Sequence, residues 1–313
     1  MEPRGWANRV GRGATAALGL PMFDAVFRLT RAVLCAGLLG LSTVVLSVLL
    51  LLPALLKRAL PLRPVQGACD RLLMALAGAW VSLNNRWIAF CNPRTTWRVE
   101  GLDGLNPRGW YVLTCNHLSA VDILVLQRVL HGRIPFLKFF LKRELIWVPV
   151  IGMAWWALDF PFMRRGKTRE DQRRDLEAAR ASCEAFRRVP TSVINFVEGT
   201  RVTAEKREAE RSPYRHLLKP KVGGLSVALA TMGEQFEALL DLTLVYPGGT
   251  PSFWDLLCGR LPAVVLRVQR RDIPENLLGM DASGERARLV RQARWLEQLW
   301  QEKDAWIEAT LKP

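Results

Sequence analysis

One segment of the 313-residue chain, NHLSAVD, contains residues that can act as a general base. His117 and Asp122 are separated by four residues, and an apolar run that predicts a buried strand precedes them. If His117 lies in the loop after that strand and Asp122 in the first turn of the next helix, the carboxylate can reach the imidazole. Such a contact raises the basicity of the free ring nitrogen, as deprotonation of a hydroxyl requires. The structural alternative is a helix-capping aspartate beside a core histidine.

A second polar segment, Glu198, Gly199, Thr200 and Arg201, directly follows another apolar run, TSVINFV. Gly199 lets the backbone approach a ligand closely. Thr200 and Arg201 offer a hydroxyl, an N–H and a bidentate cation for a phosphate, and Glu198 is placed to hold the arginine. The structural alternative is a turn with a surface salt bridge.

A third segment, FPFMRRG, places Arg164 and Arg165 after an apolar stretch. Solvated surface charge would also explain these two arginines. All three polar segments follow predicted strands, however, and open α/β sheets bind ligands outside the carboxyl ends of their strands. Together they predict one phosphate-lined site that contains a base.

The elements that must position these residues follow Pro93, where short apolar runs alternate with longer helical patterns. Strands are predicted at 110–115, 158–163, 191–197, 239–246 and 263–269, and helices at 120–130, 169–188, 224–232 and 284–311. This alternation is typical of an α/β sheet domain.

The N-terminal region predicts a membrane segment. Residues 32–56 carry no charge, and as a helix they would extend about 37 Å, which exceeds the hydrocarbon thickness of a bilayer. A second apolar segment, 72–90, is interrupted by polar residues and suits a half-embedded helix. One full span and a re-entrant hairpin both remain open, because basic residues flank residues 32–56 on both sides. Residues 145–158 are too short to span and predict a core segment or a membrane-facing lip.

The composition supports this assignment. The net charge is +15, half of the residues are hydrophobic, and twelve tryptophans accompany three tyrosines. Ample apolar material excludes disorder, and the charge predicts polyanionic partners. A nucleic-acid binder is not expected, because the charge is spread over the chain and a membrane segment is present.

The cysteines predict reduced thiols in a protein that faces the cytosol, because they are scattered and form no CxxC pair or zinc-site spacing. Cys115 is expected to lie within a strand, so a thiol nucleophile is not favoured. No metal site is predicted.

Four blocks carry a resemblance to a known family. NHLSAVD, FMRR, VEGTR and LVYPGG resemble, in this order, the conserved blocks of the PlsC-like glycerolipid acyltransferases, the lysophosphatidic acid acyltransferase superfamily. The resemblance runs from about Trp97 to Val268, with Arg165 at the motif arginine and Arg164 in a variable position. The apolar N-terminus and the segment RSPYRHLLKPKVGG look most like the bacterial YihG branch, and KREL with FPFMRRG is also similar to eukaryotic lysophospholipid acyltransferases.

The resemblance implies a mixed α/β sheet flanked by helices, with N-terminal membrane helices. The expected organisation is a basic arm at 1–31, a membrane-embedded helical hairpin at 32–92, an acyltransferase domain at 93–275 and a C-terminal helix at 276–313. Membrane phospholipids are expected partners, and a bacterial inner membrane, with the catalytic domain on its cytoplasmic side, is the expected location.

The resemblance also assigns roles to residues. His117 would be the general base and Asp122 its support, in direct acyl transfer from acyl-CoA or acyl carrier protein to the free hydroxyl of a lysophospholipid. The remaining assignments are phosphate binding by Arg165, Glu198, Gly199, Thr200 and Arg201, and support by Asn116, Arg164 and Pro247. No metal or cofactor is implied.

The expected acceptor is 1-acyl-glycerol-3-phosphate, which would give phosphatidic acid. Arg164 stands where the family often has an acid, so a more anionic head group is also compatible. The alternatives are the same chemistry on another lysophospholipid or a lyso-aminolipid, and a non-catalytic lipid-binding membrane protein.

Overall fold

The computed structural model describes residues 14–163, 170, 177, 186, 188–261, 263–278 and 284–312. Its centre is a mixed six-stranded sheet with the order β1-β8-β7-β2-β6-β3. The strands are β1 (Trp97–Glu100), β2 (Tyr111–Cys115), β3 (Leu137–Phe139), β6 (Ser192–Phe196), β7 (Ala238–Val245) and β8 (Val264–Arg271). The predicted α/β class is confirmed.

Strand direction brings the polar segments together. β2 pairs in parallel with both β6 and β7, and β3 pairs in parallel with β6. The carboxyl ends of β2, β6 and β7 therefore meet at one edge of the sheet. β8 runs antiparallel to β7 and pairs in parallel with β1. Every residue of β2 is buried, as expected for a strand covered on both faces.

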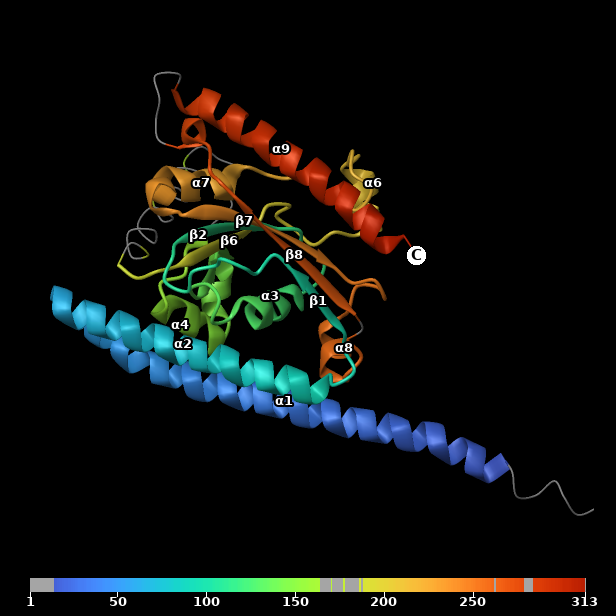
Figure 1. Cartoon of the computed structure of the whole chain (residues 1–313). Coiled ribbons are helices and arrows are strands. Elements are labelled where there is room, and N and C mark those ends of the chain that lie inside the picture. Colours follow the sequence, from blue (N-terminus) through green and yellow to red (C-terminus); the bar gives the residue numbers. More distant parts are fainter. Residues whose placement is uncertain are drawn as a thin grey trace, which may run out of the picture.

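Helices cover both faces of the sheet (Figure 1). On one face lie α3 (Asp122–Leu130), α4 (Ile151–Ala157) and α8 (Phe253–Leu257), with α1 (Ala14–Ala59) and α2 (Arg63–Cys91) outside them. On the other face lie α7 (Gly223–Met232) and α9 (Gly284–Leu311). Smaller elements are β4 (Leu141–Lys142), β5 (Phe162–Met163), α6 (Ala204–Ala209) and the 3-10 helices η1 (Arg143–Trp147), η2 (Gly233–Gln235) and η3 (Glu275–Leu277).

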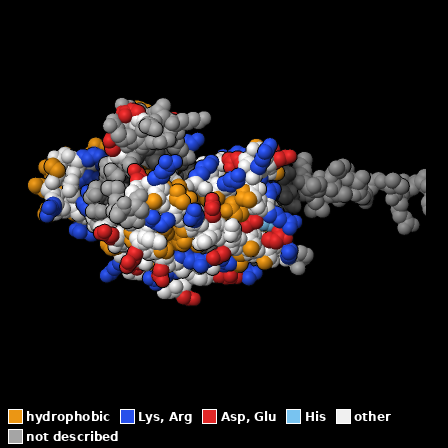
Figure 2. Space-filling model, turned by 90° about the horizontal axis from the view of Figure 1, so that it is seen from above, with side chains coloured by type: hydrophobic (Ala, Val, Ile, Leu, Met, Phe, Trp, Pro, Cys, Tyr) orange, Lys and Arg blue, Asp and Glu red, His pale blue; other side chains and the backbone are white. Residues whose placement is uncertain are grey.

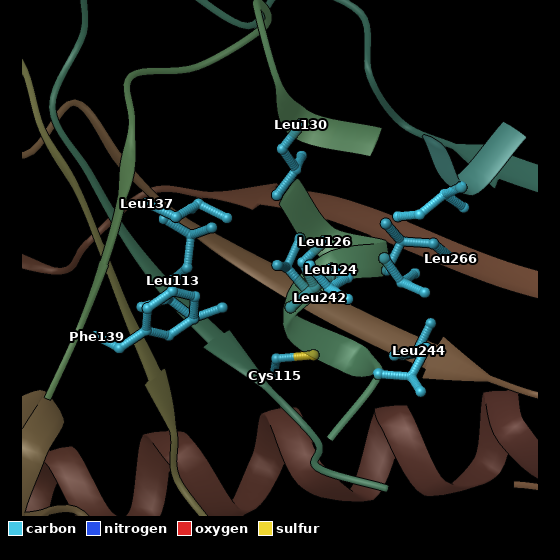
Figure 3. Packing of buried hydrophobic residues seen from close by; sticks show 14 of the residues in the cluster. Leu113, Cys115, Leu124, Leu126, Leu130, Leu137, Phe139, Leu242, Leu244 and Leu266 are labelled. Carbon is cyan, nitrogen blue, oxygen red and sulfur yellow. The ribbon is translucent and has the colours of Figure 1, made fainter. Parts of the chain in front are cut away.

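The core below the sheet is aliphatic. Leu113 and Cys115 of β2 pack with Leu126 and Leu130 of α3, while Phe139 of β3 closes the side (Figure 3). Since these side chains are buried, α3 is fixed relative to the end of β2. This packing determines where the first turn of α3 meets the loop after β2.

Helix α1 lies along the domain over most of its length, and its N-terminal turns extend beyond it (Figure 1). Ala32, Cys35, Leu50 and Ala54 are buried against the protein. The opposite side of the helix is apolar and exposed, with Val33, Leu34, Leu38, Leu41, Val45, Val48, Leu52 and Leu55. Its segment Leu29–Ala59 is long and apolar enough to cross a membrane by length and composition.

A buried ion cluster fixes the end of α1. Lys57 donates to Asp70 of α2 at 2.9 Å and also to Asp159 in the turn after α4. Arg188 contacts the other oxygen of Asp70 at 3.0 Å. A buried ammonium requires such partners, so this cluster fixes α1 and α2 to the domain.

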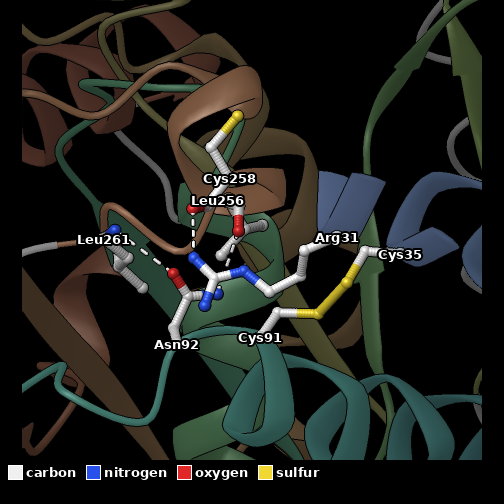
Figure 4. Close-up of a disulfide and its surroundings, with 7 residues drawn as sticks. All are labelled: Arg31, Cys35, Cys91, Asn92, Leu256, Cys258 and Leu261. Carbon is white, nitrogen blue, oxygen red and sulfur yellow. Dashed lines mark hydrogen bonds between the residues drawn. A yellow bond between two sulfur atoms is a disulfide. The ribbon is translucent and has the colours of Figure 1, made fainter. Parts of the chain in front are cut away.

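A disulfide joins the other end of the helix pair. Cys35 of α1 is bonded to Cys91 of α2, although the two residues are 56 positions apart in the sequence (Figure 4). Beside it, Arg31 donates to the carbonyl of Cys258. The prediction of reduced thiols was therefore wrong for this pair, because only the antiparallel packing of two long helices brings the two sulfurs together. Cys69, Cys115 and Cys258 are free and buried.

The outer surface on the α9 side differs from that of α1. Figure 2 shows basic, acidic and apolar side chains interspersed over this face. Such a mixture is typical of a face in contact with water. Helix α1, whose exposed side chains are largely apolar, lies on the opposite side of the molecule from α9 (Figure 1).

Several predicted elements are confirmed and others differ. The strands and helices predicted at 110–115, 120–130, 191–197, 224–232, 239–246, 263–269 and 284–311 correspond to β2, α3, β6, α7, β7, β8 and α9. The strand predicted at 158–163 is reduced to β5, which pairs with β4 outside the main sheet. Most of the helix predicted at 169–188 lies outside the described residues. Helix α1 begins at Ala14, within the segment predicted as a basic arm.

Candidate active site

His117 and Asp122 form the predicted pair at the end of β2. Nδ1 of His117 lies 2.9 Å from Oδ2 of Asp122, with 18% of the histidine side chain and none of the aspartate exposed. Since a carboxylate only accepts hydrogen bonds, Nδ1 carries the proton and Nε2 carries the lone pair. No described residue bonds to Nε2. The free nitrogen is therefore available to accept a proton from a substrate.

Asp122 is held rigidly at the start of α3. Its Oδ2 also accepts the backbone N–H groups of Leu118 and Ser119, at 2.6 and 2.9 Å. Its Oδ1 accepts the hydroxyl of Tyr246 at 2.9 Å. Burial and the neighbouring Asp122 raise the pKa of Tyr246, so its hydroxyl remains a donor. Asp122 thus orients the imidazole from a carboxylate that cannot rotate.

Glu198 has a different position from the predicted one. It is fully buried, and its two oxygens accept the backbone N–H groups of His117 and Leu218 at 2.8 and 2.9 Å. A carboxylate in this position does not contact a phosphate of a ligand, so the direct phosphate-binding role is corrected to one of holding the loop of His117. Burial raises the pKa of Glu198 to about 7, against the opposing effect of these two hydrogen bonds.

The C-terminal helix supports this arrangement. Asp304 of α9 accepts the backbone N–H groups of Arg215 and His216 at 2.9 and 2.8 Å. Two residues further on, Leu218 donates to Glu198. A continuous series of contacts therefore runs from α9 through the segment 215–218 and Glu198 to His117.

Asn116 has a structural role. Its side-chain amide donates to the carbonyl of Leu244 and accepts the N–H of the same residue, both at 2.9 Å. This pair of bonds continues the β2–β7 ladder past Cys115. Both amide groups are thus committed to β7, so Asn116 supports the loop by joining it to this strand.

Gly199, Thr200 and Arg201 form an open turn beside His117. Gly199 has φ of +71°, a conformation that favours glycine. The next residue after the turn, Val202, donates its N–H to the carbonyl of His117 at 2.8 Å. The Arg201 side chain is exposed and no described residue pairs with it. The structure therefore brings this predicted anion site and the predicted base together.

The remaining predicted residues lie farther from these contacts. Pro247 is exposed and directly follows Tyr246, and the loop that it begins is bonded to the histidine loop through Ser119, whose hydroxyl donates to the carbonyl of Pro251. Arg164 and Arg165 lie outside the described residues. The strand before them, β5, ends at Met163, whose partner in β4 is Lys142.

Sequence reasoning missed several contributors. Phe196 stacks on the imidazole of His117 with ring centroids 4.1 Å apart, and Tyr246 holds Asp122. Phe196 directly precedes the VEGTR block and Tyr246 lies within LVYPGG, so these motifs were the only available signal. Cys115 is buried, and burial raises the pKa of its thiol well above the usual value, which argues against a thiolate nucleophile.

An apolar cavity of about 290 Å³ is lined in part by α3, the helix that begins at Asp122. Ala120 and Ile123, which flank Asp122, line it together with residues of α1, α2 and α4. Its other walls include Leu46, Leu50, Trp80, Phe139, Ala154 and Phe253. The predicted apolar segment 145–158 thus contributes to a cavity shared with the N-terminal helices.

The donor set does not suggest a metal centre. Among the described residues, no group of three or more His, Cys, Asp or Glu side chains is arranged to bind an ion. The prediction that no metal or cofactor is needed stays a prediction.

Two curated relatives are similar over the same region. Mouse 1-acyl-sn-glycerol-3-phosphate acyltransferase gamma is 29% identical over 212 residues, which cover 62% of this chain and 51% of the mouse protein. Arabidopsis thaliana 1-acyl-sn-glycerol-3-phosphate acyltransferase 3 is 28% identical over 211 residues, with the same coverage of 62% and 51%. The chain thus spans about half the length of the curated relatives it matches.

A solved structure shares the fold. The crystal structure of the 1-acyl-sn-glycerophosphate acyltransferase PlsC from Thermotoga maritima superimposes with a TM-score of 0.55 at 15% identity, covering 91% of this chain and 98% of that one. The closer resemblance to the YihG branch is not tested by these similarities. The Acyltransferase family model matches residues 96–252, half of the 313 residues. The chain therefore belongs to the acyltransferase family, within the lysophosphatidic acid acyltransferase superfamily.

Proposed function

We propose that this protein transfers a fatty acyl group from a thioester to the free hydroxyl of a lysophospholipid. The observation that carries the proposal is the pair His117 and Asp122. The helix that Asp122 begins lines an apolar cavity, and a cationic turn is bonded to the His117 loop through Val202. An acyl chain fits an apolar cavity and a head-group phosphate fits a cationic turn. A lysophospholipid that places its acyl chain in the cavity and its phosphate at the turn would bring its free hydroxyl to the base.

The reaction proceeds in one ternary complex. Nε2 of His117 accepts the proton of the acceptor hydroxyl while the oxygen of that hydroxyl attacks the thioester carbonyl carbon. The C–O bond forms, the C–S bond breaks, and the proton on Nε2 passes to the departing thiolate. Asp122 stabilises the imidazolium that exists between these steps. The protein forms no covalent intermediate.

The names of the relatives favour 1-acyl-sn-glycerol-3-phosphate as the acceptor. Acyl-CoA or acyl carrier protein is proposed as the donor. Thr200 and Arg201 would hold the phosphate of the acceptor, and Arg165 is proposed to contribute because it stands at the motif arginine. The apolar cavity would take an acyl chain, with each methylene buried there contributing about 0.8 kcal/mol.

Membrane attachment through α1 would bring the lipid to the site. The exposed apolar side of this helix extends along the base of the domain while its other side is packed on protein. We infer that α1 enters one face of the bilayer with the domain resting on it, because a perpendicular crossing would draw the packed domain into the membrane. The bacterial inner membrane and its cytoplasmic face are part of the same proposal.

An acyl-transfer assay tests the proposal. Purified protein in vesicles would be given radiolabelled oleoyl-CoA and, in parallel, lysophosphatidic acid, lysophosphatidylethanolamine and lysophosphatidylglycerol. Phosphatidic acid as the main product is the expected result. A product from another acceptor only would keep the chemistry and change the substrate. Absence of product from every acceptor and donor, with lipid binding retained, would favour a non-catalytic lipid-binding protein.

A further inference from the structure

Two lysines flank the turn Gly199–Arg201. Lys206 lies outside the recognised motifs, and Lys221 lies in the segment RSPYRHLLKPKVGG but had no assigned role. Lys206 of α6 donates through Nζ to the hydroxyl of Thr200 at 2.6 Å and to the carbonyl of Arg201 at 3.1 Å. Helix α6 itself is short and capped by Thr203, whose hydroxyl accepts the N–H of Lys206. Lys206 therefore fixes the shape of the turn from its outer side.

Lys221 lies across the turn. Its backbone N–H donates to the carbonyl of Val197 at 2.6 Å, which joins it to the end of β6. A Cβ placed on Gly199 would lie 3.5 Å from Cδ and 3.8 Å from Nζ of Lys221. The ammonium thus lies against the residue that makes the turn, on the side where other residues would carry a side chain.

The ammonium of Lys221 is not committed to a strong partner. Its side chain is 60% exposed, and its ion pair with Glu210 is long, at 4.0 Å. Glu198, the carboxylate nearest in sequence to the turn, is buried and saturated by backbone donors. Arg201, Lys206 and Lys221 therefore place three positive charges around one turn, with Glu205 near Lys206 and Glu210 at 4.0 Å from Lys221.

We propose that Lys221 binds a phosphomonoester dianion at this turn, and that Lys206 is a positioning residue that keeps Thr200 and Arg201 in place for it. This inference rests on the proposed function and makes the acceptor class more specific. A phosphomonoester carries about −1.5 to −2 charge near neutral pH, whereas a phosphodiester head group carries about −1, so a second cation favours the monoester. Lysophosphatidic acid is the acceptor that presents such a group.

The attachment of the turn to the base favours the acceptor as the source. Val202, directly after the turn, is bonded to the carbonyl of His117, so a phosphate at the turn lies beside the base. The 3′-phosphate of CoA is also a phosphomonoester, so the two substrates must be distinguished by experiment.

The test compares Lys221→Met and Lys221→Arg with wild type. Arg108→Ala is the matched control, because this exposed arginine precedes β2 at the opposite end of the strand from His117. For Lys221→Met, the KM for lysophosphatidic acid is expected to rise about tenfold, since a charge-assisted contact is lost, with kcat and the KM for oleoyl-CoA unchanged. Lys221→Arg is expected to retain most of the affinity for lysophosphatidic acid. In both variants, the activity on the diester lysophosphatidylglycerol is expected to change less than about twofold.

Three outcomes would overturn the proposal. They are a selective rise in the KM for oleoyl-CoA, an equal loss on the monoester and diester acceptors, and an unchanged KM for lysophosphatidic acid. Lys206→Met is also expected to raise the KM for lysophosphatidic acid. Wild-type kinetics for this variant would contradict the positioning role of Lys206.

A binding measurement separates this inference from the proposed function. Dodecyl lysophosphatidic acid would be titrated against His117→Ala, which blocks turnover, with and without Lys221→Met. About tenfold weaker binding in the double variant is expected even if no acyl transfer is ever detected. Equal binding by the two proteins would contradict the phosphate site independently of catalysis.

Discussion

The carboxylate of Glu198 accepts the backbone N–H of His117 at 2.8 Å, across 81 residues of sequence. Its second oxygen holds Leu218, so the end of β6, the loop of the base and the segment 215–218 meet at one buried group. The glutamate of the VEGTR block therefore acts on the base through the backbone. Its effect on catalysis is expected to be one of position.

Glu198→Gln tests this role through the pH dependence of the free energy of unfolding. The pKa of Glu198 is raised from 4.5 to about 7 in the folded protein, so between these values the folded state holds a proton that the unfolded state has released. The contribution of Glu198 to stability is thus fully present below pH 4.5 and is lost as pH rises through 7, by at most about 3 kcal/mol. Denaturant unfolding from pH 4.5 to 8 should show this decline in wild type and not in the variant.

The same substitution should lower the rate. A glutamine offers one acceptor where two backbone N–H groups need one each, so one of them loses its partner at a cost of about 1–3 kcal/mol. We expect kcat to fall while the KM values change little. A variant with unchanged kcat and a wild-type pH dependence of unfolding would contradict the assignment.

Tyr246→Phe tests the support of Asp122. Removal of one hydroxyl leaves the carboxylate with its other three donors, so a loss of about 0.5–1.5 kcal/mol is expected. This corresponds to a decrease in kcat of about 2- to 13-fold, with the KM for the acceptor unchanged. Steady-state kinetics with lysophosphatidic acid measure it.

Tyr111→Phe is the matched control, because Tyr111 lies in β2 and donates its hydroxyl to Glu237 at 3.2 Å, far from the histidine loop. It should leave kcat unaltered. If both variants lose activity equally, Tyr246 acts through general stability and not through Asp122.

Ala154→Leu tests the apolar cavity. Ala154 of α4 lines the cavity, so a larger side chain there shortens the space available to an acyl chain. We expect kcat/KM for oleoyl-CoA to fall about tenfold and that for lauroyl-CoA to change little, since a few methylenes lose their apolar contacts. Met153→Leu, at an exposed neighbouring position, is the control. If Ala154→Leu leaves the chain-length profile unchanged, the acyl chain does not bind in this cavity.

Replacement of Leu34, Leu41 and Leu52 by Asp together tests the membrane attachment through α1. All three side chains are exposed on the apolar side of the helix. Charged groups there would oppose insertion, so vesicle co-sedimentation should be lost while near-UV circular dichroism is retained. Leu311→Asp, exposed on α9, should sediment as wild type does. Sedimentation of the triple variant with vesicles would contradict the proposed membrane face.

The sequence predicts this site well where the functional residues lie close together in the chain. His117 and Asp122 are separated by four residues, so one loop and one helical turn bring them together. The α/β class follows from short apolar runs that alternate with helical patterns, and β2 and β6 were found because most of their residues are apolar. Helix α9 was found from its long charged pattern.

Long-range relationships could not be predicted. The bond from Tyr246 to Asp122 depends on β7 lying beside β2, and no local pattern specifies strand order. β3 was missed because Lys138 interrupts its apolar run, although that lysine is buried against Phe186. The disulfide between Cys35 and Cys91 depends on the alignment of two helices that the sequence leaves undetermined.

The central claim is that Nε2 of His117 removes the proton of a lysophospholipid hydroxyl. The most direct measurement is the rate of phosphatidic acid formation from lysophosphatidic acid and oleoyl-CoA by wild type, His117→Ala and His131→Ala in vesicles. His131 is a matched control, because it lies at the end of α3 opposite to Asp122 and its ring is bonded to Ser82 of α2. The account predicts a decrease of about 10²- to 10⁴-fold for His117→Ala and a normal rate for His131→Ala. Product formation at the wild-type rate by His117→Ala would contradict it.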